Sequence, residues 1–175
     1  MTANAVAKGI FIVRSFRKSI GATAQRDRVA GDRGQHRPAL NQRLCGQFAD
    51  LYAKVDGRGG YEVALALATG AALPPRRAGS FPVAASVPLR TFQSVRVGRA
   101  PTRERLTEVE RLHPGTLAFN ECASGQHLQV MPDVEDGCSA RYGVLNLGAE
   151  SRSDVLHKSA VIASGLGYEL APATE

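Results

Sequence analysis

Cysteine and histidine carry the most reactive side chains of this sequence, and they gather in its second half: His113, Cys122, His127, Cys138 and His157. A cysteine and a histidine that meet can act as nucleophile and base, because a nearby base lowers the pKa of the thiol. Cys122 and His127 are five residues apart, and Glu121 adds a carboxylate beside them. One hypothesis is therefore a small cytosolic hydrolase or transferase with its site near Glu121, Cys122 and His127. The competing interpretation is structural, because cysteine is commonly a small buried hydrophobe and this spacing is not a transferable motif.

Metal-binding patterns are incomplete in this chain. A structural zinc site takes four ligands from closely spaced pairs such as C-x2-C, and no pair here has that spacing. Asp133, Glu135 and Asp136 resemble the start of a calcium loop, but Gly137 stands at position 5, where the EF-hand requires an oxygen ligand. We predict a solvated hairpin loop at these residues, and neither a metal nor a cofactor.

Three glycines lie together in Gly57-Arg58-Gly59-Gly60, ahead of an apolar segment. Such a loop can present backbone N–H groups to a phosphate at the start of a helix. The dinucleotide fingerprint also requires a preceding strand and full G-x-G-x-x-G spacing, and the phosphate loop of NTPases requires a lysine. The sequence lacks these features, so a plain turn is the favoured interpretation.

Basic residues form the remaining chemical signal, in an N-terminal stretch with almost no large apolar side chains between residues 21 and 39. The candidate nucleic-acid-binding residues are Arg14, Arg17, Lys18, Arg26, Arg28, Arg33 and Arg37. Arginine binds phosphate oxygens bidentately, and a disordered basic segment can fold onto nucleic acid. Because no known DNA- or RNA-binding motif is present, we expect contacts to the backbone of nucleic acid or of another polyanion.

The net charge of +6 is distributed unevenly. Nineteen of the 22 lysines and arginines lie at or before Arg111, whereas the 16 acids divide equally, so residues 1–111 carry about +11 and the rest about −5. This asymmetry favours an anionic partner. Codon composition is the alternative explanation, because the abundant Ala, Gly, Pro and Arg all have GC-rich codons. A GC-rich reading frame with no selected function would show the same bias, weak periodicity and no complete site.

Cellular location is constrained by cysteine usage and by hydropathy. Cys45, Cys122 and Cys138 are too few, and odd in number, for a disulfide framework, which predicts a reducing compartment such as the cytoplasm. The longest apolar run, residues 63–68, is far shorter than the roughly 20 residues of a membrane helix, so we expect no membrane span. The arginine-rich N-terminus has no acid before Asp27, which makes organelle targeting the alternative location.

A central helix pair over residues 40–73 is the arrangement best supported by periodicity. One face of its first helix, which Asn41 can cap, collects large apolar side chains at helical spacing: Leu44, Phe48, Leu51, Tyr52 and Val55. Residues 61–68 alternate like a strand but are rich in helix formers, and we predict a second helix there. Because this helix is apolar almost all round, we expect it to be the most buried element, with Leu65 in the same core as Phe48.

Weaker signals flank the helix pair. Residues 1–39 are predicted to be a basic, largely flexible arm; within it, residues 4–20 favour a helix, although the apolar run 10–13 would serve equally well as a buried strand. Residues 74–88 contain four prolines, which predicts an extended linker ahead of the α+β portion at residues 89–175.

The C-terminal portion combines helix and strand signals. Helices are predicted over residues 102–113 and 154–164, the second with Leu156, Ala160 and Ala163 facing inward. Short strands in an antiparallel meander are predicted at residues 89–97, 116–119, 127–131 and 141–147. The predicted fold is thus a single small α+β domain with a basic arm. Because no catalytic site is complete, we expect a non-enzymatic accessory protein that binds nucleic-acid backbone through its N-terminal arm.

Overall fold

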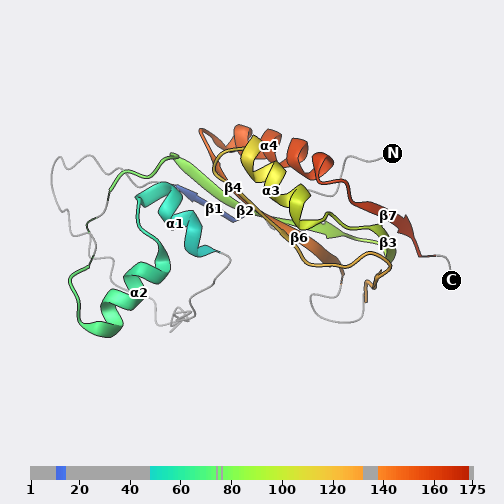
Figure 1. Ribbon diagram of the computed structural model, residues 1–175, viewed down its shortest axis with the longest axis horizontal. Helices are drawn as coiled ribbons and strands as arrows, with labels where there is room; N and C mark the ends of the chain where they lie inside the picture. The colour runs from blue at the N-terminus through green and yellow to red at the C-terminus, as the bar shows by residue number, and fades with distance from the viewer. Residues whose placement is uncertain (1–10, 15–47, 74, 76, 132–137, 174–175) are drawn as a thin grey trace, which may run out of the picture.

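The computed structural model describes residues 11–14, 48–73, 75, 77–131 and 138–173 (Figure 1). These residues form β1 (Phe11–Arg14), α1 (Ala49–Asp56), α2 (Gly60–Thr69), β2 (Val83–Thr91), β3 (Val95–Arg99), α3 (Arg103–Leu112), β4 (Thr116–Asn120), β5 (His127–Leu128), β6 (Ala140–Ala149), α4 (Arg152–Gly165) and β7 (Glu169–Pro172). The predicted α+β class is confirmed, with a central helix pair and short antiparallel strands after it. The rest of the predicted arm and the loop at residues 132–137 lie outside the described residues.

The strands form two antiparallel sheets. One sheet has four strands in the order β1-β2-β6-β4, and the other has three in the order β5-β3-β7. The longest pairing joins β2 to β6, from Val83 opposite Ala149 to Thr91 opposite Ala140. Strands that follow each other in the chain are therefore often not neighbours, and the predicted meander is wrong. Long-range pairing overrides the simpler sequential order because β2 and β6 are the two longest apolar strands.

The main core lies between one face of the four-stranded sheet and helices α3 and α4, which run beside each other in Figure 1. Alternate residues of β2 and β6 point to this face because side chains in a strand alternate. Among them Val87, Leu145 and Leu147 are fully buried, together with Val155 and Ile162 of α4.

Helix α1 covers part of the other face of the same sheet. Its Leu51 and Val55 pack on Ala84 of β2, and Phe48 adds to this cluster from the residue before the helix. Both faces of β2 are therefore covered where α1 lies, which explains why all but one of its nine residues are buried.

Helix α2 corrects the prediction of a buried second helix. Of its residues only Ala66 is buried, and Leu65 and Leu67 are each 66% exposed. Leu65 thus does not share a core with Phe48. The reason is geometric: α2 extends away from both sheets in Figure 1 and packs chiefly on α1, so its apolar surface has too few neighbours to cover it.

Residues 11–14 and 83–88 both form strand structure that the sequence analysis did not favour. Residues 11–14 form a strand, the alternative to the favoured helix, and pair with β2 from Arg14 opposite Val83 to Phe11 opposite Ser86. Residues 83–88, predicted as the end of a linker, are part of β2. Pro88 lies opposite Val144 of β6 and close to a shift in register between Leu89 and Arg90, and proline within a strand is tolerated at such irregularities.

Helices α3 and α4 begin at hydroxyl caps. Thr102 accepts a hydrogen bond from Arg105 N, and Ser151 accepts one from Asp154 N. The inward face of α4 is formed by Val155, Ser159 and Ile162, one residue away from the predicted face; Leu156 is 44% exposed. The error arose because α4 carries apolar residues on both sides. In the described residues no helix is long and apolar enough to cross a membrane.

Candidate functional site

The structure separates the residues of the predicted enzyme site. Glu121 and Cys122 follow the end of β4, and His127 begins β5. Cys122 is 8% exposed and packs with Val97 and Leu128. Because neighbouring residues of a strand point to opposite faces, His127 points away from the side on which Leu128 meets Cys122. His127 is exposed, so the imidazole is not positioned to act as a base toward the thiol.

The charge beside Cys122 also opposes a nucleophilic role. Burial, and secondarily the carboxylate of Glu121, raise the pKa of the Cys122 thiol. A reactive cysteine needs the reverse, a thiolate favoured by positive surroundings. The thiol instead lies 3.5 Å from Oδ1 of Asn120, whose Nδ2 donates to the carbonyl of Cys122 at 2.8 Å.

Glu121 is held by an arginine instead of being directed at the thiol. Arg141 of β6 donates from Nε and Nη2 to the two carboxylate oxygens of Glu121, the second at 2.8 Å. A two-point pair of this kind fixes both side chains. It braces the end of β4 against β6, so the arrangement around Cys122 is that of a structural joint.

Two tyrosines complete this joint. The rings of Tyr142 and Tyr168 meet edge to face with centroids 4.9 Å apart, and both side chains pack against the cores of the two sheets. The Tyr168 hydroxyl lies 3.0 Å from Asn120 Oδ1 and 3.2 Å from the carbonyl oxygen of Tyr142, and it donates to these acceptors. Burial raises the pKa of both phenols, most strongly that of Tyr168. The two packed rings, together with the hydrogen bonds of the Tyr168 hydroxyl, connect the two sheets.

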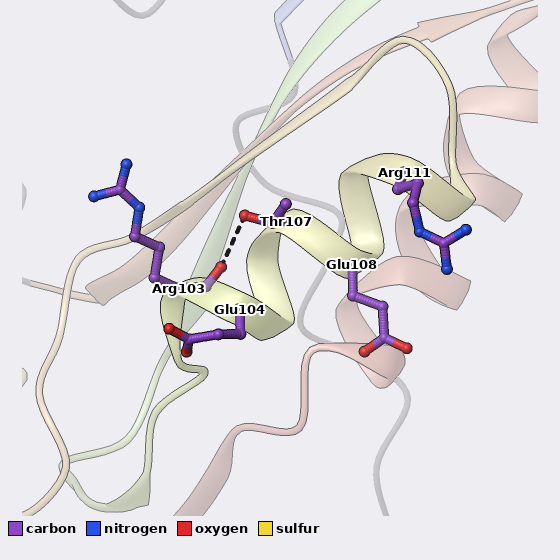
Figure 2. A pocket seen from close by; sticks show the side chains of 5 residues that line it. All are labelled: Arg103, Glu104, Thr107, Glu108 and Arg111. Carbon is purple, nitrogen blue, oxygen red and sulfur yellow. Dashed lines mark hydrogen bonds between the residues drawn. The ribbon is translucent and has the colours of Figure 1, made fainter.

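The hollow drawn in Figure 2 is a surface feature of about 450 Å³ on α3. Its lining residues all come from this one helix: Arg103, Glu104, Thr107, Glu108 and Arg111. The Thr107 hydroxyl donates back to the carbonyl of Arg103 at 3.1 Å, and Glu108 accepts from Arg105 at 2.6 Å. A hydrogen bond from the backbone lowers the pKa of Glu104 at the start of the helix. Residues on a single helical face cannot enclose a substrate, so we assign this hollow to the solvated face of α3.

Metal ligands do not gather in the described part of the chain, where no group of three histidine, cysteine, aspartate or glutamate residues is placed to hold an ion. Asp133, Glu135 and Asp136 lie outside the described residues. The glycines of the proposed phosphate loop end α1 and begin α2: Gly57 takes a left-handed φ of 68° as the C-cap, and Gly59 is the N-cap. They form the turn favoured from the sequence.

A buried polar contact between β6 and α1 was not predicted from the sequence. Asn146, 1% exposed in β6, donates to Asp50 of α1 at 2.6 Å, and Asp50 also pairs with Lys54. The sequence feature that could have indicated this contact is the asparagine inside the apolar run 143–149. A buried side-chain amide requires a hydrogen-bond partner. The contact fixes α1 on the sheet.

Of the predicted nucleic-acid-binding residues, only Arg14 lies in the described part, at the end of β1. The others are outside it: Arg17, Lys18, Arg26, Arg28, Arg33 and Arg37. The sequence nevertheless fixes the charge on each side of residue 43: residues 1–43 contain nine cations and two acids, a net charge of +7, and residues 44–175 carry −1. No protein family, curated protein or solved structure matches this chain.

Proposed function

We propose that this protein is a non-enzymatic accessory protein that binds the phosphate backbone of nucleic acid through its basic N-terminal residues. The observation that carries the proposal is the concentration of positive charge in residues 1–43, at +7, against −1 in the remainder. Phosphates attract such a segment through release of their condensed counterions. The chemistry requires no enclosed cavity, in keeping with the open surface of α3.

Several cations of the folded part are already paired with carboxylates. Ion pairs engage Arg99 with Glu169, Arg105 with Glu108 and Arg141 with Glu121. A cation already facing a carboxylate offers little net attraction to a phosphate. The N-terminal segment has nine cations for two acids, so most of its positive charge cannot be neutralised within the segment.

Strand β1 gives the basic segment a fixed point on the domain. Phe11–Arg14 pairs with β2 at the edge of the four-stranded sheet, so this part of the N-terminal segment is fixed to the domain. Deleting residues 1–39 would therefore remove a strand along with the charges. Substitution of arginines outside β1 is the cleaner test, because it changes charge without exposing the edge of β2.

The deciding experiment is a titration of fluorescently labelled duplex DNA and single-stranded RNA at about 50 mM and about 200 mM salt. We expect affinity to fall steeply with salt and to depend little on base sequence. Replacing Arg26, Arg28, Arg33 and Arg37 by serine should reduce the salt slope on duplex DNA by up to about 3.6, because each phosphate that is no longer neutralised lowers the slope by about 0.9.

A matched variant removes the same charge from the folded surface. Arg77, Arg96, Arg111 and Arg152 are all exposed, and their replacement by serine also lowers the net charge by four. We expect this variant to keep most of the wild-type salt slope. Absence of binding at low salt, or an equal reduction of the slope in the two variants, would overturn the proposal.

The proposed activity belongs to the cytoplasm, in keeping with the low cysteine content, and organelle targeting is the alternative. Cell fractionation distinguishes the two locations.

A further inference from the structure

Strand β4 is the last strand of the four-stranded sheet, so one of its sides pairs with β6 and the other pairs with no described strand. Its five residues, Thr116–Asn120, include no charged residue and no proline, and Leu117 and Phe119 are 37% and 47% exposed. An apolar edge strand of this kind is a template for pairing with another chain. The outer strand β7 of the other sheet is less open to pairing, because it contains Glu169 and Pro172.

The backbone groups on the free side of β4 belong to alternate residues. The N–H of Ala118 donates to Oε1 of Glu110 at 2.9 Å and therefore points away from β6. Because backbone groups alternate in direction along a strand, those of Thr116 and Asn120 point the same way. The Thr116 N–H donates to the carbonyl oxygen of His113 at 3.1 Å. Groups from α3 and its C-cap thus occupy two of the three outward N–H groups of β4.

The carboxylate of Glu110 opposes the addition of a further strand. A charged acceptor forms a stronger hydrogen bond with a backbone N–H than a neutral acceptor does. An incoming strand would have to displace the carboxylate from Ala118 or enclose its charge beside apolar side chains, and burying an unpaired charge is costly. Glu110 is partly buried on α3, which packs on β4, so a neighbouring element holds the carboxylate at this edge.

We propose that Glu110 closes the β4 edge against pairing with β4 of a second copy of this chain. Without the carboxylate, two copies of β4 can pair antiparallel about a twofold axis at Ala118, because their outward backbone groups then face each other. In that register Leu117 of one copy lies opposite Phe119 of the other, and such apolar cross-strand pairs stabilise a sheet. The inference does not depend on nucleic-acid binding.

Sedimentation equilibrium of the full chain and its variants tests the proposal, from about 10 µM to about 1 mM protein. Glu110→Ala frees the Ala118 N–H in both copies, so we expect self-association to be at least about tenfold stronger than in the wild type. Glu110→Gln keeps an oxygen acceptor and should stay close to the wild type. The matched control is Glu108→Ala, which removes one carboxylate from the same helix, because Glu108 faces Arg105 instead of β4.

A second substitution locates the contact on β4. Adding Phe119→Lys to Glu110→Ala places a charge on the edge strand and should return self-association to the wild-type level, because a charged edge resists pairing. Phe119 is 47% exposed, so a lysine there extends into solvent without disturbing the core. Circular dichroism and urea unfolding of each variant establish that the fold is retained.

Hydrogen exchange of the wild-type chain gives a measurement that needs no variant to fold. No described strand pairs with the outward side of Ala118. Its N–H should nevertheless exchange at least about tenfold more slowly than an unstructured amide, because the hydrogen bond to Glu110 must open first.

Several outcomes would overturn the proposal. A Glu110→Ala chain that associates no more strongly than the wild type, or an Ala118 N–H that exchanges at the unstructured rate, would show that the carboxylate does not close the edge. Equally strong association of Glu110→Gln or Glu108→Ala would assign the effect to charge instead of the hydrogen bond. Association that survives Phe119→Lys would use another surface.

Discussion

Leu147 and Leu65 are the same side chain in two regions of one chain, and the fold treats them in opposite ways. Leu147 is fully buried in β6, whereas Leu65 is 66% exposed on α2. The surrounding sequence is apolar in both regions. Burial is decided by whether a second layer of structure meets the side chain. Helices α3 and α4 cover the sheet, whereas α2 packs chiefly on α1 among the described elements. Similar pairs exist for tyrosine and cysteine, and each pair makes the comparison testable.

The largest effect is expected for the leucine pair. Leu147→Ala should lower the free energy of unfolding by about 2 to 5 kcal/mol, because a fully buried leucine leaves a cavity in a packed core. Leu65→Ala should change it by less than about 0.5 kcal/mol, as is usual for an exposed side chain. Urea unfolding of the wild type and of each variant measures both values.

Equal destabilisation by the two substitutions would break the comparison. It would mean that Leu65 is covered in solution by part of the same chain. A small effect of Leu147→Ala would instead mean that the layer formed by α3 and α4 is not tightly packed on the sheet.

Local signals explain which elements were predictable. Helix α3 lies within the predicted range because Pro101 and Thr102 begin it and Pro114 with Gly115 ends it, all within the same short stretch of chain. Strands β4 and β6 fall where β-branched and aromatic residues predicted them. These features need no knowledge of distant residues.

Tertiary contacts explain what the sequence could not predict. The pairing of β2 with β6 joins residues that are 49 to 66 positions apart in the chain. This distant pairing places the proline-containing residues 83–88 in a buried strand. The exposure of α2 could not be predicted from its own sequence either. An apolar composition predicts that a helix is buried, but it does not show which other element would cover that helix. The inward face of α4 was ambiguous for the same reason.

The candidate enzyme site shows how little of a functional site can be predicted from sequence spacing. Cys122 and His127 are close in sequence, but the strand geometry of β5 turns the imidazole away from the thiol. Asn120, Tyr142 and Tyr168, which do surround Cys122, come from β4, from β6 and from the segment between α4 and β7. No spacing rule could have joined them. The basic N-terminal segment, in contrast, is a property of composition and was visible at once.

The tyrosine pair gives a smaller, pH-dependent effect. Tyr168→Phe removes the hydroxyl that donates to Asn120 and should cost about 0.5 to 1.5 kcal/mol at neutral pH. Burial raises the pKa of Tyr168 above its ordinary value of 10.0, so the folded protein retains a proton that the unfolded chain loses. Stability is therefore full below about pH 10 and falls as the pH rises above it. The variant should lose less stability than the wild type over that range.

Tyr61→Phe is the control for this substitution. Tyr61 is 57% exposed on α2, and its replacement should leave stability at neutral pH within about 0.5 kcal/mol and preserve the alkaline loss due to Tyr168. Urea midpoints at several pH values give both profiles. An alkaline loss that is the same in Tyr168→Phe as in the wild type would exclude Tyr168 as its source.

The smallest effect, and the one closest to function, concerns the cysteines. Cys122 is buried and its thiol pKa is raised, whereas Cys138 is exposed. Alkylation by iodoacetamide in the native protein should therefore modify Cys138 quickly and Cys122 slowly, because the thiolate is the reacting species and the reagent must also reach it. The rate at Cys122 should continue to increase above pH 9, the ordinary value of a thiol, since its pKa lies higher.

Peptide mapping by mass spectrometry separates the two sites from Cys45, which lies outside the described residues. Unfolding in urea supplies the control, because it should bring the labelling rates of Cys122 and Cys138 together. If Cys122 reacts in the native protein as fast as Cys138, the joint formed by Asn120, Tyr142 and Tyr168 must open readily. A fast, pH-dependent reaction that His127→Ala slows would go further, because it would show that the imidazole reaches the thiol in solution and would favour the enzyme hypothesis over a purely structural role for this joint.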